Sequence, residues 1–173
     1  MNKQDLAKKI KEAAYLEGDF ILSSGRRSKY YMDKYLFETR PEILAPLVKE
    51  MAKAVADLKF DRIAGPEIGA ITLAAALSLE TGKPFIIIRK EPKKYGISKF
   101  IEGEIKSSEK VLLVEDILTT GTQAIIAADR IKEAGADVIM LLGIIDRQEG
   151  AREAIEKAGL KYRAVFTKSE LGI

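Results

Sequence analysis

Short apolar runs alternate with amphipathic stretches along most of this chain of 173 residues. In the second two-thirds of the chain, several of these runs are nearly continuous in apolar residues, as strands buried on both faces are. We predict strands at 61–65, 84–89, 110–115, 137–146 and 162–167. Because helical stretches separate them, the pattern predicts a parallel sheet with helices on both faces.

The remaining pattern predicts helices, one hairpin and one long loop. We expect helices at 2–16, 41–57, 68–81, 121–134 and 149–158. Residues 18–38 alternate and contain Ser24 and Gly25, which indicates a short antiparallel hairpin. Residues 90–105 are rich in charge and are predicted to form a loop-like insert. No repeat or Pro/Gly-rich linker interrupts the pattern, so we expect a single domain over 1–173.

The composition narrows the possible chemistry. The chain has no cysteine, which excludes disulfides and cysteine nucleophiles, and no histidine, the commonest general base. With 29 basic and 26 acidic residues, the net charge of +3 is too balanced to indicate nucleic-acid or membrane binding. No apolar run reaches the ~20 residues of a membrane span, and the amphipathic N-terminus is unlike a signal peptide. We therefore expect a cytoplasmic protein.

Open parallel sheets bind their ligands at the carboxyl ends of their strands. Four segments of the chain are predicted to meet at that edge, at 64–70, 89–96, 115–122 and 146–150. The third segment, 115–122, has the most groups that could bind a ligand, because it joins two adjacent acids to a turn rich in hydroxyl groups.

In the sequence VLLVEDILTTGT, the acids Glu115 and Asp116 end a buried strand and the threonines lead into a helix. The N-terminus of that helix offers unpaired N–H groups to a phosphate, and Gly121 allows a close approach. The two acids accept hydrogen bonds and so suit the vicinal hydroxyls of a ribose. A sugar 5-phosphate would satisfy both halves. The alternative is a plain helix cap, in which a threonine caps the helix and the acids favour its dipole.

The same segment resembles the motif of type I phosphoribosyltransferases that binds phosphoribosyl pyrophosphate (PRPP). The stretches GDFILSSGRRSKYYMD, IIRKEPKKYG, IEGEI and IIDRQEGA are similar to the successive signatures of the orotate phosphoribosyltransferase family. The resemblance covers about residues 17–150. It implies an α/β fold with a central, mostly parallel sheet and helices on both faces, formed by a core (39–173). It also implies a small N-terminal hood (1–38) that contains a β-hairpin.

The resemblance implies a set of residues that bind PRPP. Glu115 and Asp116 would hold the ribose hydroxyls, and Arg89, Lys90 and Lys93 would contact PRPP from the charged loop. Lys93 and Asp116 are the expected catalytic residues, and Lys93 would reach the active site of a neighbouring subunit. The turn would wrap the 5-phosphate with Ile117, Leu118, Thr119, Thr120, Gly121, Thr122 and Gln123.

Two residues are expected, by the same resemblance, to bind orotate. They are Thr119 and Arg147, whose guanidinium would pair with the orotate carboxylate. The alternative for Arg147 is a surface salt bridge with Glu149. The hairpin would form a hood over the base, with Tyr30 or Tyr31 near the orotate ring, and a packing role is equally compatible with both tyrosines.

The loop at 64–70 departs from the family pattern. Its backbone would face the pyrophosphate, and many members carry a lysine there, whereas this chain has Glu67 and no lysine. Some members also have a lysine at the position of Ser23. We therefore expect Lys93, Lys94 and magnesium to carry more of the charge compensation.

The resemblance implies a magnesium-dependent transfer of the phosphoribosyl group from PRPP to orotate. The products are orotidine 5′-monophosphate and pyrophosphate, in the biosynthesis of pyrimidines (UMP). Magnesium is expected to arrive on PRPP without a direct protein ligand, and the protein to be a homodimer that shares a loop. The alternatives are transfer to another base, which Arg147 argues against, a PRPP-binding regulator without turnover, and a phosphoacceptor receiver domain. We expect neither a nucleic-acid nor a membrane partner.

Overall fold

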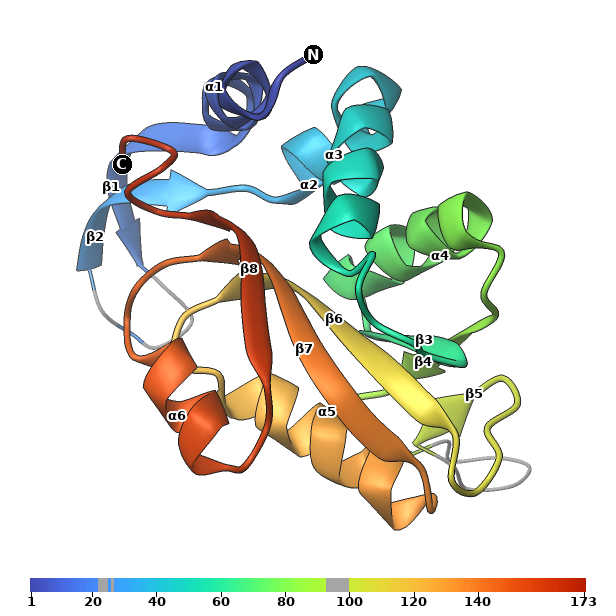
Figure 1. Ribbon diagram of the computed structural model, residues 1–173. Coiled ribbons are helices and arrows are strands. Elements are labelled where there is room, and N and C mark those ends of the chain that lie inside the picture. Colours follow the sequence, from blue (N-terminus) through green and yellow to red (C-terminus); the bar gives the residue numbers. More distant parts are fainter. Residues whose placement is uncertain (22–24, 26, 93–99) are drawn as a thin grey trace.

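The computed structural model describes residues 1–21, 25, 27–92 and 100–173 (Figure 1). Its helices are α1 (Lys3–Ala14), α2 (Tyr35–Glu38), α3 (Pro41–Ala54), α4 (Gly69–Thr81), α5 (Thr122–Glu133) and α6 (Ala151–Lys157). Its strands are β1 (Tyr15–Ile21), β2 (Arg27–Met32), β3 (Arg62–Pro66), β4 (Phe85–Ile88), β5 (Ile101–Glu102), β6 (Lys110–Leu118), β7 (Asp137–Asp146) and β8 (Tyr162–Thr167).

The predicted sheet is confirmed. Within the described residues it has six strands in the order β5-β4-β3-β6-β7-β8, and every neighbouring pair is parallel except β4 with β5. The predicted hairpin is also confirmed, as the antiparallel pair of β1 and β2. The sheet order reverses between β3 and β6, because β4 lies on one side of β3 and the later strands lie on the other. Parallel sheets bind ligands at such a switch point.

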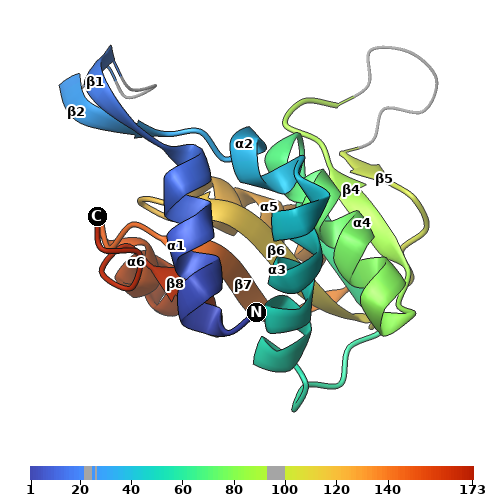
Figure 2. The same ribbon diagram turned by 90° about the horizontal axis from the view of Figure 1, so that it is seen from above.

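Helices cover both faces of the sheet, as predicted (Figures 1 and 2). Helices α1 to α4 pack on one face and α5 and α6 on the other. Strand β6 shows why its apolar run is unbroken: Leu112 and Val114 enter the cluster with α1 to α4, and Val111 and Leu113 enter the cluster with α5 and α6. A strand buried on both faces has no position left for a polar side chain until it nears the edge of the sheet.

Two elements differ from the prediction. The charged segment 90–105, predicted as loop, contains β5, which pairs antiparallel with β4 through Ile101 and Glu102. A strand of two residues is too short to produce an alternating pattern. Strand β6 also continues to Leu118, three residues past its predicted end, so both acids lie inside the strand. The turn predicted at Ser24 and the role predicted for Lys93 lie outside the described residues.

The N-terminal segment packs onto the core. Leu6, Ile10 and Phe37 belong to the same hydrophobic cluster as α3 and α4. The division into a hood (1–38) and a core (39–173) stays a prediction. Within the described ranges, no helix is both long and apolar enough to cross a membrane.

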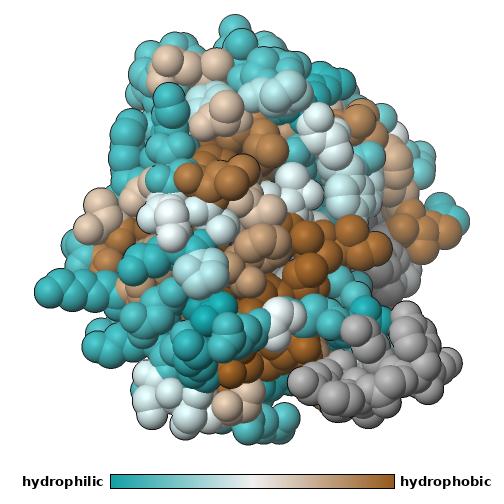
Figure 3. Space-filling model, turned by 90° about the vertical axis from the view of Figure 1, so that its right-hand side faces the viewer, coloured by the Kyte–Doolittle hydropathy of each residue, from teal (hydrophilic) through white to brown (hydrophobic). Residues whose placement is uncertain are grey.

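Helix α4 carries apolar residues all round instead of on one stripe. Leu73 and Leu77 are fully buried on its inner side, whereas Leu79 is 88% exposed. Ile68, directly before the helix, is 68% exposed. Figure 3 shows hydrophobic side chains gathered on the side of the molecule where α4 lies in Figure 1.

Candidate active site

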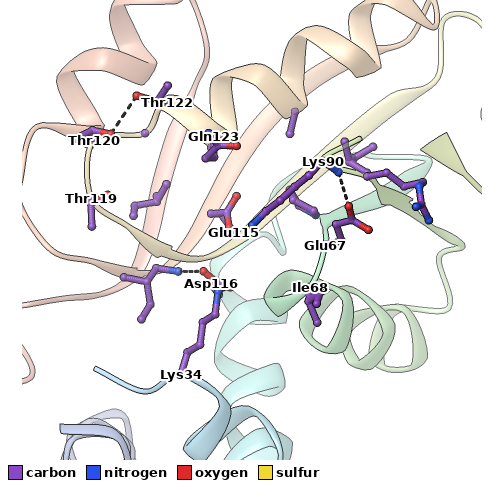
Figure 4. Close-up of a pocket in the computed structure, with 18 of the residues that line it drawn as sticks. Lys34, Glu67, Ile68, Lys90, Glu115, Asp116, Thr119, Thr120, Thr122 and Gln123 are labelled. Atoms are coloured by element: carbon purple, nitrogen blue, oxygen red, sulfur yellow. Dashed lines mark hydrogen bonds and ion pairs between the residues drawn. The ribbon is translucent and has the colours of Figure 1, made fainter. Parts of the chain in front are cut away.

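A cavity of about 360 Å³ opens at the carboxyl ends of β3, β4 and β6 (Figure 4). Three of the four segments predicted to meet at this edge line it, with residues 66–68, 88–90 and 115–124. Every PRPP-binding residue predicted within the described chain therefore faces one space. The remaining lining comes from Lys34, Tyr35, Ala127 and Arg130.

The turn between β6 and α5 has the form that an anion site needs. Gly121 has φ 77°, and a Cβ there would lie 3.1 Å from Ile155 Cγ1, so the position favours glycine on both grounds. No described side chain caps α5, and the hydroxyls of Thr120 and Thr122 lie 3.1 Å from each other. The helix-cap alternative is therefore not observed. The first N–H groups of a 12-residue helix are left to meet an anion in the cavity.

The two acids of β6 are neighbours in sequence but have different surroundings. Successive side chains of a strand point to opposite faces, and in Figure 4 the two carboxylates lie on opposite sides of the β6 ribbon. Asp116 is 3% exposed; its Oδ1 accepts from the backbone N–H of Ile117 and its Oδ2 accepts from Lys34 Nζ. Glu115 has a buried Oε2 that finds no hydrogen-bond partner among the described residues. The pleat thus gives each acid a separate contact surface, while the charge of Asp116 still acts on Glu115.

A third carboxyl group lies behind the pair. Glu38 of α2 is fully buried, and neither of its side-chain oxygens has a hydrogen-bond partner within the described part of the chain. Burial, and then the charge of Asp116, raise the pKa of Glu38 to about 8. The same two causes raise the pKa of Glu115 to about 8. Strongly perturbed carboxyl groups that line or adjoin a cavity mark a functional site.

The contacts of Glu67 explain why the loop before α4 carries an acid at this position. Glu67 Oε1 accepts a hydrogen bond of 2.6 Å from the backbone N–H of Lys90, so this acid fastens the loop to the end of β4. Its own N–H donates to the carbonyl of Ile88 at 2.8 Å and is already occupied. The peptide bond between Glu67 and Ile68 is cis. Glu67 therefore lines the cavity and, through its Oε1, also binds the neighbouring segment.

The basic residues at the end of β4 are held from α5. Arg130 donates from Nη1 to the carbonyl of Arg89 and from Nη2 to that of Lys90, the second at 2.9 Å. Its guanidinium also stacks 4.2 Å from the centre of the Phe100 ring. Arg130 thus fixes both ends of the segment that contains Lys93, which itself lies outside the described residues.

Arg147 follows β7 and does not line the cavity, although it lies beside it. Its backbone N–H donates to the carbonyl of Leu118 at 2.9 Å, which places it next to the phosphate turn. Its Nη2 lies 2.9 Å from both Tyr30 Oη and Glu149 Oε1. The salt bridge with Glu149, the alternative for Arg147, is therefore present, and Tyr30 of the hairpin also contacts Arg147. Arg147 Nε is buried and, among described atoms, without a partner.

Sequence reasoning missed three residues at this site. Arg130 had a signal, because Gln123, Ala127 and Arg130 have the i, i+4, i+7 spacing of one helix face, and all three line the cavity. Lys34 and Glu38 had no such signal, because Lys34 precedes and Glu38 ends a four-residue helix that the pattern does not reveal. They come near Asp116 because α2 packs against α1, α3 and α4, close to the carboxyl end of β6.

The comparisons with known proteins agree with this geometry. The family model of the phosphoribosyl transferase domain matches residues 38–162. The orotate phosphoribosyltransferase of Pyrococcus horikoshii is 47% identical over 94% of this chain and 88% of its own length. That of Pyrococcus abyssi is 45% identical over 98% of this chain and 94% of its own.

A solved structure gives the same result. The crystal structure of orotate phosphoribosyltransferase from Mycobacterium tuberculosis in complex with PRPP is 31% identical to this chain, and it has a TM-score of 0.85 over 99% of both chains. The type I phosphoribosyltransferase fold expected from the resemblance is thereby confirmed. With relatives this similar over nearly their whole length, the chain belongs to the orotate phosphoribosyltransferase family.

Proposed function

We propose that the cavity binds PRPP and that the chain transfers its phosphoribosyl group to orotate. The observation that carries this proposal is the pairing of two features in one space. Asp116 and Glu115 lie a few residues before an uncapped helix N-terminus, and both features line the same cavity. Ribose hydroxyls suit the acids and a 5-phosphate suits the helix, so one sugar phosphate spans both.

Orotate would then lie between the phosphate turn and Arg147. The hydrogen bond from the Arg147 N–H to Leu118 O holds the backbone of Arg147 beside the turn that contains Thr119, the second expected orotate ligand. The Arg147 guanidinium lies 5.2 Å from the centre of the Tyr30 ring, which gives it a fixed orientation. A planar guanidinium reads a carboxylate through two parallel hydrogen bonds. Orotate carries that carboxylate and other nucleobases do not, so Arg147 favours orotate over them.

The reaction forms a bond from an orotate nitrogen to the ribose anomeric carbon and breaks the bond from that carbon to the pyrophosphate oxygen. The electron pair of the broken bond leaves with pyrophosphate, and the configuration inverts. The orotate nitrogen is acidic enough to attack as an anion, so a chain without histidine needs no general base. The protein's contribution is to position the reactants and to stabilise the charges of the transition state. Lys93 is expected to approach the leaving pyrophosphate.

Magnesium fits this site as a ligand of PRPP. Among the described residues, no three acidic side chains form a cluster that could hold a metal by themselves. Mg²⁺ usually keeps several waters and binds substrate phosphates in place of an all-protein cage. When bound, it would neutralise charge on the pyrophosphate group, while Asp116 and Glu115 hold the hydroxyls.

A homodimer and a cytoplasmic location belong to the same proposal. The hydrophobic side chains gathered on the side of α4 in Figure 3, where Leu79 is 88% exposed, support a second copy as their cover, since contiguous apolar patches mark association surfaces. If Lys93 serves the neighbouring site, then a Lys93→Ala chain mixed with an Arg147→Ala chain forms hybrids with one intact site. Partial recovery of activity on mixing two inactive parents is the expected result, and no recovery would contradict the shared loop.

A direct assay tests the function. Protein, PRPP, Mg²⁺ and orotate are mixed, and the loss of orotate absorbance is followed. Turnover with orotate and none with uracil, adenine or hypoxanthine is expected. Product with one of these bases but not with orotate would overturn the substrate, and PRPP binding without any product would favour the regulator. Lys93→Ala is expected to reduce turnover, and unchanged turnover would contradict its role.

A further inference from the structure

Lys34 places a positive charge where the loop at 64–70 has none. Its Nζ donates to Asp116 Oδ2, and the chain of α2 brings it to the cavity from the N-terminal segment (Figure 4). The first residue of α4 lies directly against this pair: a Cβ on Gly69 would lie 1.7 Å from Asp116 Oδ2 and 2.6 Å from Lys34 Nζ. Glycine is therefore required at this point. The ammonium group consequently lies at the N-terminus of α4, beside the loop that faces the pyrophosphate.

Lys34 is charged and able to move. Its side chain is 28% exposed, whereas that of Asp116 is 5% exposed, so the acid is fixed and the lysine has an open side. Burial alone would lower the pKa of Lys34, but the charge of Asp116 and the hydrogen bond to it outweigh burial and raise the pKa. A lysine reaches its partner through a flexible four-carbon stem. It can therefore exchange one anion for another without a change in the backbone.

The contact with Asp116 limits how a ribose can bind. Asp116 Oδ1 accepts from the Ile117 N–H and Oδ2 accepts from Lys34, and the residue is only 3% exposed. Each oxygen can accept a second hydrogen bond, but a hydroxyl that approaches Oδ2 from the cavity competes with the Lys34 ammonium for the little space there. The displaced ammonium then lies next to the uncapped N-terminus of α4, a 13-residue helix whose dipole also favours an anion.

We propose that Lys34 is a pyrophosphate-binding residue that neutralises Asp116 in the free protein and turns to the pyrophosphate of PRPP when the ribose hydroxyls take its place. This inference rests on the proposed function. It accounts for a loop that has Glu67 and no lysine, because the missing charge comes from α2 instead. The exchange keeps the count of charges constant: Asp116 loses an ammonium and gains hydroxyl donors, and the pyrophosphate gains the ammonium.

Binding measurements with two ligands distinguish a pyrophosphate-binding role of Lys34 from a purely structural role. Orotidine 5′-monophosphate has the ribose hydroxyls and the 5-phosphate but no pyrophosphate, whereas pyrophosphate has neither sugar group. In Lys34→Gln, the KM for PRPP and the Kd for magnesium pyrophosphate are expected to rise about tenfold, the cost of one charge-assisted hydrogen bond. The Kd for orotidine 5′-monophosphate is expected to stay the same or fall, because its hydroxyls no longer compete with Lys34.

Lys34→Arg keeps the charge and is expected to bind pyrophosphate within about threefold of the wild type. Lys53→Gln is the matched control: Lys53 is exposed and pairs with Glu50 at 2.7 Å on α3, away from the cavity. It should change none of the three constants. Equal weakening of pyrophosphate and orotidine 5′-monophosphate by Lys34→Gln would overturn the proposal, because it would mean that Lys34 only orders Asp116. No weakening of either ligand would overturn it too.

The wild-type protein provides a measurement that does not depend on the folding of Lys34→Gln. Lysine side chains labelled with ¹³C at Cε are followed by NMR, and the Lys34 signal is identified by its absence in Lys34→Arg. Magnesium pyrophosphate is expected to shift this signal, and an unmoved signal at saturation would overturn the proposal. Binding of pyrophosphate is measured without turnover, so the result stands even if orotate proves not to be the accepted base.

Discussion

The acids at the two ends of strand β6 differ in the hydrogen-bond donors that they receive. At the end where the strand begins, Glu109 receives two hydrogen bonds from Arg62, at 2.7 and 2.8 Å, and a third from the Lys106 N–H at 3.0 Å. At the end where the strand finishes, Glu115 has a buried oxygen without a described partner, and Asp116 accepts from the Ile117 N–H and from the partly exposed Lys34. Acids lie at both ends, but among the described residues only the acid at the first end has three donors.

The pKa values express this difference. The hydrogen bond from Arg62 is the largest influence on Glu109 and lowers its pKa to about 2. Burial is the largest influence on Glu115 and raises its pKa to about 8. Buried carboxylates without donors weaken a fold, so their presence at one end indicates that a ligand supplies the donors there. The first end stabilises the sheet, and the second end is prepared for a substrate.

The largest expected effect follows from removing the charge of Asp116. In Asp116→Asn, kcat/KM for PRPP should fall about 100-fold or more, because an amide is a weaker acceptor for the ribose hydroxyls at the moment of transfer. The melting temperature should stay near that of the wild type, since Lys34 is partly exposed and returns to water. Steady-state kinetics and thermal unfolding measure the two effects. Asp137→Asn, an exposed acid at the other edge of the same sheet, is the control and should change neither.

If Asp116→Asn unfolded the protein and left the residual activity per folded molecule unchanged, then the contrast between the two ends would be wrong. Asp116 would in that case be a structural acid like Glu109. Activity is therefore expressed per molecule of folded protein, measured by circular dichroism on the same sample.

The sequence predicted the parts of this site that one segment encodes. The run from Glu115 to Gln123 contains acids, hydroxyls and the glycine in a fixed spacing, so its chemistry could be predicted before its position. The sheet could be predicted because burial on both faces leaves an unbroken apolar pattern. Lys34 and Glu38 could not be predicted, because about 80 residues separate them from Asp116 in the sequence and only the packing of α2 against α1, α3 and α4 brings them near it.

The next effect concerns stability at the beginning of β6. Glu109→Gln leaves the guanidinium of Arg62, whose side chain is 7% exposed, without its counter-charge. We expect the free energy of unfolding to fall by about 2 kcal/mol at pH 7, while kcat/KM stays within twofold. Urea unfolding and the orotate assay measure the two quantities. Glu156→Gln, an exposed acid of α6 that pairs with Arg152 at 3.6 Å, is the control and should leave both unchanged.

The pH dependence sharpens this prediction. A carboxyl group whose pKa is lowered by folding stabilises the fold above its unfolded value of 4.5, and this stabilisation is lost as the pH falls towards about 2. Wild type should therefore lose stability between pH 4.5 and 2 by more than Glu109→Gln does. If the unfolding free energies of the two proteins fell in parallel below pH 4.5, the Arg62–Glu109 pair would contribute nothing to stability.

The smallest effect has the opposite sign and belongs to the other end of the strand. Glu38 is fully buried, and its pKa is raised from 4.5 to about 8, so the folded state keeps a proton that the unfolded state releases between these values. Stability is then complete below pH 4.5 and falls as the pH rises to about 8. Glu38→Gln is uncharged at every pH and nearly the same shape. Its decline in unfolding free energy from pH 5 to pH 9 should be about 1–2 kcal/mol smaller than that of the wild type.

The charged groups around Glu38 determine how much of the alkaline loss of unfolding free energy Glu38→Gln removes. Asp116, Glu115 and Asp33 raise the pKa of Glu38, and Lys34 lowers it. Because Glu115 titrates over the same range, Glu38→Gln should keep part of the alkaline decline, and only the difference from wild type belongs to Glu38. Glu42→Gln, an exposed acid in the first turn of α3, should follow the wild-type curve. A Glu38→Gln curve that coincides with wild type from pH 5 to pH 9 would mean that Glu38 is already charged at pH 5. The binding end of β6 would then hold its acids by donors, as the other end does.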